Sequence, residues 1–322
     1  YKQQLQNFIE RAGSSEPALL GICSDAGGGI QRGANWGPLF IREKLQLGNY
    51  AESYLDIGDV RIIPHLLHDK YINQTTLENC RQALYPDQSQ YRDLPVSPLS
   101  IAENALDLIY QLSPNQKILA LGGDHSVSYP LVKSFLKAKN AQGIRCGLIH
   151  FDAHTDLLET RLGIDICFGS WLTHVLSDFQ HPNDVAQFGI RSTARTKDHW
   201  QQTFGIKQYW ASEIVENGIT EFCQQTIECF QANGVDEIYI SFDIDALDAS
   251  IASATGTPEF EGLRLEDCLI AINLFASAFP ITGADLVEVA PMVNPNFSPK
   301  EPESTLLAAQ RLCEALLNHL AR

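Results

Sequence analysis

Asp152, His154 and Asp156 follow the apolar run CGLI (146–149) at every second position. In a continuing strand, side chains two residues apart point to the same face. Two carboxylates and an imidazole would then crowd one face beside a hydrophobic core. Because a buried carboxylate without compensation is very costly, such groups are paired or bind metal. The spacing therefore predicts a cation site where this run ends.

Acids and imidazoles accompany other apolar runs too. They are Asp124 and His125 after KILALGG (117–123), Asp243, Asp245 and Asp248 after EIYISF (237–242), and Glu288 within ADLVEVA (284–290). Ligands of parallel α/β sheets bind at the carboxyl ends of the strands, so we expect one edge of a sheet to collect these groups. Each motif alone could be a turn or an ion-paired acid, and their joint occurrence favours metal binding.

The types of candidate ligand indicate which cations would bind. The candidates are His125, Asp152, His154, Asp156, Asp243 and Asp245. Most of these ligands are oxygen donors and none is a thiolate, which favours Mn²⁺ over structural Zn²⁺. The two histidines argue against Mg²⁺ or Ca²⁺ alone. Six side chains suit two ions about 3.5–4 Å apart that share and activate a water. We expect two Mn²⁺ per chain, with Ni²⁺, Co²⁺ or Zn²⁺ as alternatives.

Three motifs closely resemble signatures of the ureohydrolase superfamily of arginase, agmatinase and formimidoylglutamase. They are GGDHS (122–126), FDAHTD (151–156) and SFDIDALDAS…TGTP (241–258). The segments GGGIQRGANWGPLFIR (27–42) and DLVEVAP (285–291) are similar to further family segments. The resemblance runs from about residue 18 to the last helix. It implies one arginase-like domain over residues 1–322, a three-layer αβα fold with a mainly parallel sheet.

The resemblance also implies roles for individual residues. One Mn²⁺ would bind His125, Asp152, Asp156 and Asp243, and the other would bind Asp152, His154, Asp243 and Asp245. Glu288 would hold the cationic carbon unit of the substrate, and Asp245 would shuttle the proton to the leaving amine. The implied reaction is hydrolysis of a C–N bond in a linear amidine, giving urea from a guanidino compound. Release of formamide from formimidoylglutamate is the alternative reaction, and a non-catalytic metal-binding regulator is the alternative from another class.

The sequence departs from the family beside the implied site. Phe168 stands where arginases and agmatinases carry a His, and His174 follows six residues later. Phe168 could wall a substrate pocket or simply pack in the core. Arginases and agmatinases also differ from this chain in the loop that would recognise the substrate tail. Arg161 or Arg195 could bind a carboxylate there, and Glu159 or Asp165 could bind an amine.

Two competing motifs are weaker. GGGIQRG (27–33) faintly resembles a dinucleotide fingerprint, but its spacing is one residue too long and Arg32 intrudes. A glycine-rich turn beside the active site is the better interpretation. Cys167 could be a nucleophile, although a buried inert thiol is the commoner situation.

Strands and helices must alternate to position these groups. The expected strands are 18–23, 117–123, 145–152, 186–191, 237–243 and 281–290, and the expected helices are 38–47, 126–139, 219–233, 264–278 and 305–320. This order predicts a parallel α/β sheet. Residues 84–98 are expected to form a loop within the domain.

Composition limits the possible partners. The chain has 322 residues with a net charge of −16 and lacks a basic run, so neither nucleic acid nor an anionic membrane is expected to bind. We also expect no membrane helix, and the polar segment 1–17 lacks the core of a signal peptide. The eight cysteines contain no C-x-x-C motif and are expected to be buried free thiols of a cytoplasmic protein. The expected partners are a small guanidino or formimino substrate and, by the resemblance, further copies in a trimer or hexamer.

Overall fold

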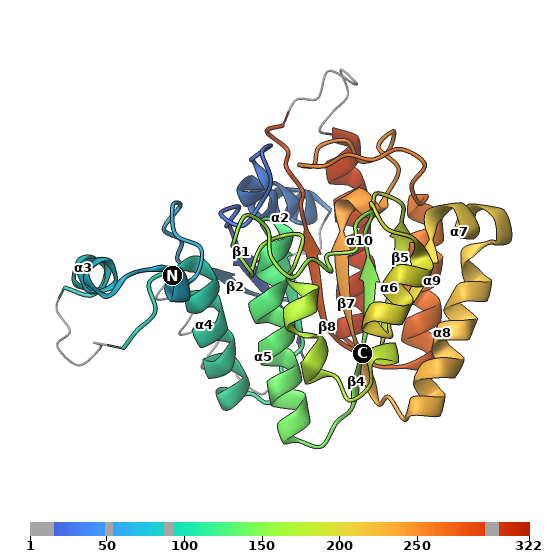
Figure 1. Cartoon of the computed structure of the whole chain (residues 1–322), viewed down its shortest axis with the longest axis horizontal. Helices are drawn as coiled ribbons and strands as arrows, with labels where there is room; N and C mark the ends of the chain where they lie inside the picture. The colour runs from blue at the N-terminus through green and yellow to red at the C-terminus, as the bar shows by residue number, and fades with distance from the viewer. Residues whose placement is uncertain (1–15, 49–53, 87–92, 294–302) are drawn as a thin grey trace.

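Eight parallel strands form one sheet in the described part of the computed structural model, which covers residues 16–48, 54–86, 93–293 and 303–322 (Figure 1). The strand order is β2-β1-β3-β8-β7-β4-β5-β6. The strands are β1 (Ala18–Ile22), β2 (Leu55–Asp59), β3 (Ile118–Gly122), β4 (Cys146–Phe151), β5 (Val185–Ile190), β6 (Lys207–Trp210), β7 (Glu237–Asp243) and β8 (Ile281–Val287). The six expected strands are all present, and the sequence did not predict β2 and β6.

Helices cover both faces of this sheet. They are α2 (Gly37–Leu47), α3 (Gln74–Leu84), α4 (Pro98–Leu112), α5 (Ser128–Ala141), α6 (Lys197–Phe204), α7 (Ala211–Asn217), α8 (Ile219–Asn233), α9 (Leu265–Ala278) and α10 (Glu303–Leu320). The five expected helices correspond to α2, α5, α8, α9 and α10. Pro38 begins α2 at a position where its missing N–H costs nothing, as predicted.

The buried apolar residues divide into two cores, one on each face of the sheet. Leu19 and Leu121 point into the core under α2, α8, α9 and α10, whereas their neighbours Leu20 and Ala120 point into the core under α4 and α5. Alternation of successive side chains between two covered faces explains why these strands are apolar throughout. The predicted three-layer αβα arrangement is therefore confirmed (Figure 1).

The centre of the sheet joins segments that are far apart in the sequence. Strand β8 lies between β3 and β7, and β7 pairs in turn with β4. Their carboxyl ends therefore lie at one edge of the sheet. These are the four strands after which the sequence places its acids and imidazoles, so the sheet brings the candidate ligands together.

Other expectations concern segments around the sheet. Residues 85–86 and 93–97 lie outside helices and strands, as expected for the loop at 84–98, but Leu84 still belongs to α3 and Pro98 already belongs to α4. Residues 87–92 of that loop and most of the N-terminal segment lie outside the described residues. All eight cysteines are free; five are buried, and Cys23, Cys80 and Cys229 are partly exposed. Among the described helices, none is long and apolar enough to cross a membrane.

Candidate metal centre

Strand β4 leads directly to three of the expected ligands. The strand ends at Phe151, so Asp152, His154 and Asp156 do not alternate along a continuing strand as the sequence suggested. They lie on a turn in which Asp156 has a left-handed backbone, with φ 53°. The turn nevertheless brings the three side chains into one cluster, in which Asp152 and Asp156 are buried and His154 is partly exposed.

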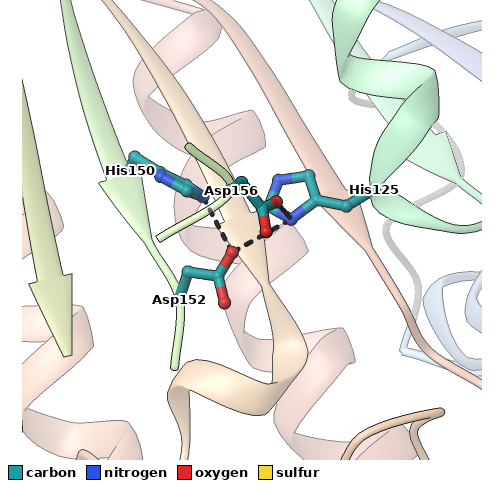
Figure 2. A group of neighbouring side chains, drawn as sticks. All are labelled: His125, His150, Asp152 and Asp156. Atoms are coloured by element: carbon teal, nitrogen blue, oxygen red, sulfur yellow. Dashed lines mark ion pairs between the residues drawn. The ribbon is translucent and has the colours of Figure 1, made fainter. Parts of the chain in front are cut away.

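His125 gathers the first group of carboxylates (Figure 2). Its Nδ1 atom lies 3.1 Å from Asp152 Oδ2, 3.0 Å from Asp156 Oδ2 and 3.1 Å from Asp243 Oδ2. The imidazole side chain is only 1% exposed. One ring nitrogen therefore lies among three carboxylate oxygens that come from two different strand ends.

His154 gathers a second group. Its Nδ1 atom lies 3.2 Å from Asp245 Oδ2 and 3.4 Å from Asp152 Oδ1. The position of Asp245 is fixed locally, because its N–H donates to Asp243 Oδ1 at 2.8 Å. Asp152 thus presents Oδ2 to the first group and Oδ1 to the second.

These groups fit divalent cations. His125 Nδ1 and Asp152 Oδ2 are buried, and neither makes a hydrogen bond to the described residues. Buried polar atoms normally have a partner, so their environment calls for a cation. The spacings of 3.0–3.1 Å around His125 are those of ligand atoms about 2.1 Å from a shared ion. His125, Asp152 and Asp156 with His150, and Asp152 and Asp245 with His154, form two groups able to hold a metal.

The electrostatics of the cluster lead to the same conclusion. Burial, followed by repulsion from Asp245 and Asp152, raises the pKa of Asp243 well above its usual range. Burial by itself would lower the pKa of His125, but the surrounding carboxylates, with Asp156 first, raise it well above its usual value. Without a cation, the cluster therefore retains protons that a divalent ion would replace.

His150 also belongs to this cluster, and the sequence interpretation missed it. It lies within β4, and its Nε2 atom is 3.0 Å from Asp152 Oδ2 (Figure 2). The available signal was its position two residues before Asp152, the spacing that singled out His154. It was overlooked because it lies inside a run interpreted only as a buried strand.

A hydrogen-bonded chain across three strands determines which ring nitrogen of a neutral His150 carries the proton. The Trp210 indole N–H donates to Gln208 Oε1 at 3.2 Å, and Gln208 Nε2 donates to Gln187 Oε1 at 2.7 Å. Gln187 Nε2 is then the donor to His150 Nδ1 at 2.9 Å. Because an indole N–H can only donate, the direction of the whole chain is fixed. A neutral His150 therefore carries its proton on Nε2, which lies 3.0 Å from Asp152 Oδ2, and of the four residues in the first group it is the one without a free lone pair for a metal.

Glu288 lies next to the two ligand groups. It follows β8 with a left-handed backbone, at φ 62°, and its N–H donates to Gly123 O at 2.8 Å. Its Oε1 atom accepts the backbone N–H of His125 at 2.9 Å. Burial and the nearby charge of Asp124 raise the pKa of Glu288 well above its usual range. A buried acid is thus held beside the cluster without belonging to either ligand group.

Phe168 and Arg161 line a cavity of about 280 Å³ that we call the side pocket. Its opposite wall is the glycine-rich segment 26–30. The Arg161 guanidinium lies 4.7 Å from the centre of the Phe168 ring. The position of Phe168 against this pocket supports the pocket-wall interpretation over simple core packing.

The glycine-rich segment is joined to the cluster rather than arranged for a dinucleotide. Gly27 N–H donates to Asp124 Oδ2 at 3.0 Å, and Gly27 O accepts Phe168 N–H at 3.1 Å. An amide that faces a carboxylate is not available to a phosphate. The turn beside the site is therefore the interpretation that the geometry supports.

Several other candidates have local structural roles. Asp165 accepts hydrogen bonds from Lys70 and Tyr71. His174 Nε2 lies 3.1 Å from the backbone oxygen of Glu159. Among the described residues, the two ligand groups include neither Asp165 nor His174.

Asp248 and Cys167 also have local partners. Asp248 accepts the N–H groups of Ser250 and Gly262, at 2.9 and 3.0 Å, and so holds a loop together. Cys167 is buried, with Sγ 3.2 Å from Ser170 Oγ. A serine hydroxyl is not the base that a thiol nucleophile needs.

Comparisons with known proteins agree with this geometry. The profile of the arginase family matches residues 15–318. The mitochondrial guanidino acid hydrolase of Homo sapiens is 29% identical over 315 residues, which cover 94% of this chain and 77% of that protein. Agmatinase of Bacillus anthracis is 28% identical over 309 residues, covering 94% and 91%. The solved structure of proclavaminate amidino hydrolase from Streptomyces clavuligerus shares the fold, with a TM-score of 0.72, 22% identity and coverage of 95% and 92%.

Proposed function

Because this chain belongs to the arginase family, we propose that it hydrolyses a C–N bond of a guanidino compound and releases urea and an amine. The proposal includes a centre of two divalent ions, with Mn²⁺ the best match to the ligand chemistry. The observation that carries it is the pair of ligand groups that share Asp152.

The contacts support a specific division of the ligands. The first ion is assigned to His125, Asp152, Asp156 and Asp243, and the second to Asp152, His154, Asp243 and Asp245. Sharing of Asp243 agrees with its contacts, because Oδ2 lies near His125 and Oδ1 accepts Asp245 N–H. When bound, such ions lower the pKa of a water so that it can attack near neutral pH, and they stabilise the charge that develops.

Two acids would do the remaining work. Glu288, buried beside the ligands, attracts the planar guanidinium and orients its carbon toward the centre. Asp245 is held by Thr257, whose hydroxyl donates to Oδ2 at 2.9 Å, and it carries the proton from the attacking water to the departing amine. Proton transfer by a positioned carboxyl group is ordinary general acid–base catalysis.

Formimidoylglutamate hydrolysis is a second candidate. Phe168 occupies the position of the His that arginases and agmatinases carry, and the structure places it against the side pocket. An aromatic ring cannot shuttle protons, so the chemistry here depends on the metal ligands and Asp245. A purely regulatory metal site would not need Glu288 buried beside a complete ligand set.

The test is an assay of the Mn²⁺-loaded protein against guanidino and formimino compounds, with urea, formamide and ammonia measured separately. We expect about two ions per chain by elemental analysis, urea from a guanidino substrate and no turnover after chelation. Formamide without urea would select the second candidate. Full activity of metal-free protein would contradict both.

A further inference from the structure

The side pocket contains an exposed cation that forms no ion pair with an acid of the described residues. Arg161 is the one charged side chain among the described residues that line it. The nearby acid Asp165 accepts hydrogen bonds from Lys70, at 2.5 Å, and Tyr71. These bonds hold the pKa of Asp165 down at about 2. Asp165, one of the two acids that could have received an amine, is thus occupied. The other, Glu159, is not among the described residues that line the pocket, so the pocket offers a positive group to its ligand.

The walls of the side pocket are attached to the metal centre. On one side, Gly27 is bonded to Asp124, the residue before His125. On the other, Phe168 lies three residues before Trp171, whose indole N–H donates to Asp156 Oδ2 at 2.7 Å. The Trp171 ring also lies 5.0 Å from the His125 ring. A ligand in the pocket therefore lies close to the centre, and both walls hold their positions relative to it.

Local backbone structure fixes Arg161 at the pocket. Arg161 and Ile164 exchange two backbone hydrogen bonds of 2.8 and 2.9 Å around Leu162 and Gly163. Both central residues are left-handed, with φ 53° and 80°, as in a type I′ turn. A leucine in this conformation is strained, and such strain is common where a loop holds a ligand-binding group. The contact with the Phe168 ring, whose centre lies 4.7 Å from the guanidinium carbon, further restricts the guanidinium.

The pocket also has apolar sides. Ile30 and Leu162 both line it and are 97% and 99% exposed. Two aliphatic side chains left in water beside a stacked arginine would gain by covering a short hydrocarbon chain. The side pocket therefore offers a cation and an apolar stretch to its ligand.

On the basis of the proposed function, we infer that the substrate is an ω-guanidino acid whose carboxylate binds Arg161. Its methylene chain contacts Ile30, Leu162 and the Phe168 ring, and its guanidinium reaches Glu288 and the metal centre. Arginine suits this role because its planar fork matches a carboxylate with two parallel hydrogen bonds. An amine-tailed substrate such as agmatine would meet the same charge and be repelled.

The test compares three guanidino compounds of similar length on the Mn²⁺-loaded protein. They are 4-guanidinobutanoate with an anionic tail, butylguanidine with a neutral tail and agmatine with a cationic tail. Shorter and longer acids are included so that the best length is used. We expect kcat/KM to favour the acid over butylguanidine by about ten- to hundredfold, the usual worth of a charge-assisted hydrogen bond.

Arg161→Met keeps much of the side-chain volume and removes the charge. It should abolish the preference for the acid, mainly by raising KM for the acid. The metal content should stay the same, and kcat/KM for butylguanidine should change far less than kcat/KM for the acid. Arg195→Met is the matched control, because Arg195 is exposed and is not among the described pocket residues. This control should keep the preference.

The outcomes separate the two proposals. Urea from butylguanidine or agmatine without preference for the acid would reject Arg161 as the carboxylate site and leave the proposed function standing. The same holds if Arg161→Met retains the preference, or if Arg195→Met loses it. Absence of urea from every guanidino compound, with two ions bound per chain, would reject the proposed function together with this inference.

Discussion

At the scale of single residues, the most consequential side chain is the carboxylate of Asp152, which contacts both ligand groups. Asp152→Asn removes a charge that both ions share, so we expect elemental analysis to show well under two ions per chain and turnover to be lost. Asp248→Asn is the control, since Asp248 holds a loop outside the cluster. Equal metal content in the two variants would contradict the assignment of Asp152.

The protonation of the cluster predicts how metal affinity depends on pH. The raised pKa values of Asp243, Glu288 and His125 mean that these groups hold protons to higher pH in metal-free protein. Metal ligands must be deprotonated, so Mn²⁺ competes with protons at Asp243 and His125, and affinity rises with pH. Chelator-competition titrations at a series of pH values should show this rise, and weakly buffered solutions should acidify on metal addition. A pH-independent affinity would contradict the prediction.

At the scale of secondary-structure elements, β5 and β6 act on the centre through Gln187 and Gln208. Gln187→Leu removes the donor to His150 Nδ1, so either ring nitrogen of His150 can then carry the proton. Because Gln187 acts on Asp152 only through His150, we expect Mn²⁺ affinity to fall by less than the roughly ten- to hundredfold that is typical of losing a direct outer partner of a metal ligand. Free Mn²⁺ can be measured by electron paramagnetic resonance during titration.

The control for this variant is Gln201→Leu, which changes the same residue type on α6, where its side chain contacts only the backbone of Gln208 among the described partners. It should bind Mn²⁺ as the parent protein does. If Gln187→Leu also bound normally, the hydrogen-bonded chain would have no part in supporting Asp152.

The turn that carries Arg161 predicts an effect on stability. Leu162 is left-handed and 99% exposed, so its side chain contributes strain without packing. Leu162→Asn should raise the free energy of unfolding by about 0.5–1 kcal/mol, because asparagine tolerates this backbone region better. Leu162→Ala retains the strain and should give no such gain. Denaturant unfolding of both variants measures the difference.

The limits of sequence interpretation are clearest at this scale. The long apolar strands were predictable because burial on both faces leaves continuous aliphatic runs. Strands β2 and β6 were not, because LDIGD and KQYW are short and partly polar, as edge strands often are. The sequence analysis did not predict helix α4, which begins at Pro98, the last residue of the expected loop 84–98. Its clear signal was Pro98 at the first turn, followed by apolar residues at helical spacing.

The site shows a similar division. Its ligands could be predicted because costly residue types recur after apolar runs. His150 and its supporting glutamines could not be predicted as a unit, because Gln187 and Gln208 meet His150 only through strand pairing. The association of Arg161 with Phe168 likewise depends on the turn at Leu162 and Gly163. The sequence did not predict this turn, because its first central residue is a leucine and not the glycine or asparagine that such turns usually carry.

At the scale of the whole molecule, the ions should act as a clamp between β3, β4 and β7. If an ion binds only the native state, one site stabilises the folded protein by ~2.7 kcal/mol when the metal concentration is a hundredfold above the dissociation constant. We therefore expect Tm to rise with Mn²⁺ concentration in calorimetry and to fall on chelation. A Tm that does not change with metal would contradict the clamp.

The expected trimer or hexamer and the cytoplasmic location stay predictions. Sedimentation analysis can test the first of them.

The central position of β8 has a consequence for the order of events during synthesis. His125 and Glu288 touch although 163 residues separate them, and β8 is the last strand of the described chain to be made. Until residues 281–287 emerge from the ribosome, β3 and β7 lack the strand that pairs with both of them. A growing chain of this kind has unpaired strand edges, which are paired only when a strand distant in sequence is added. Such pairing is slow, and the exposed edges favour aggregation until it is complete. Chaperone protection would matter most in that interval, and acquisition of the ions would mark its end.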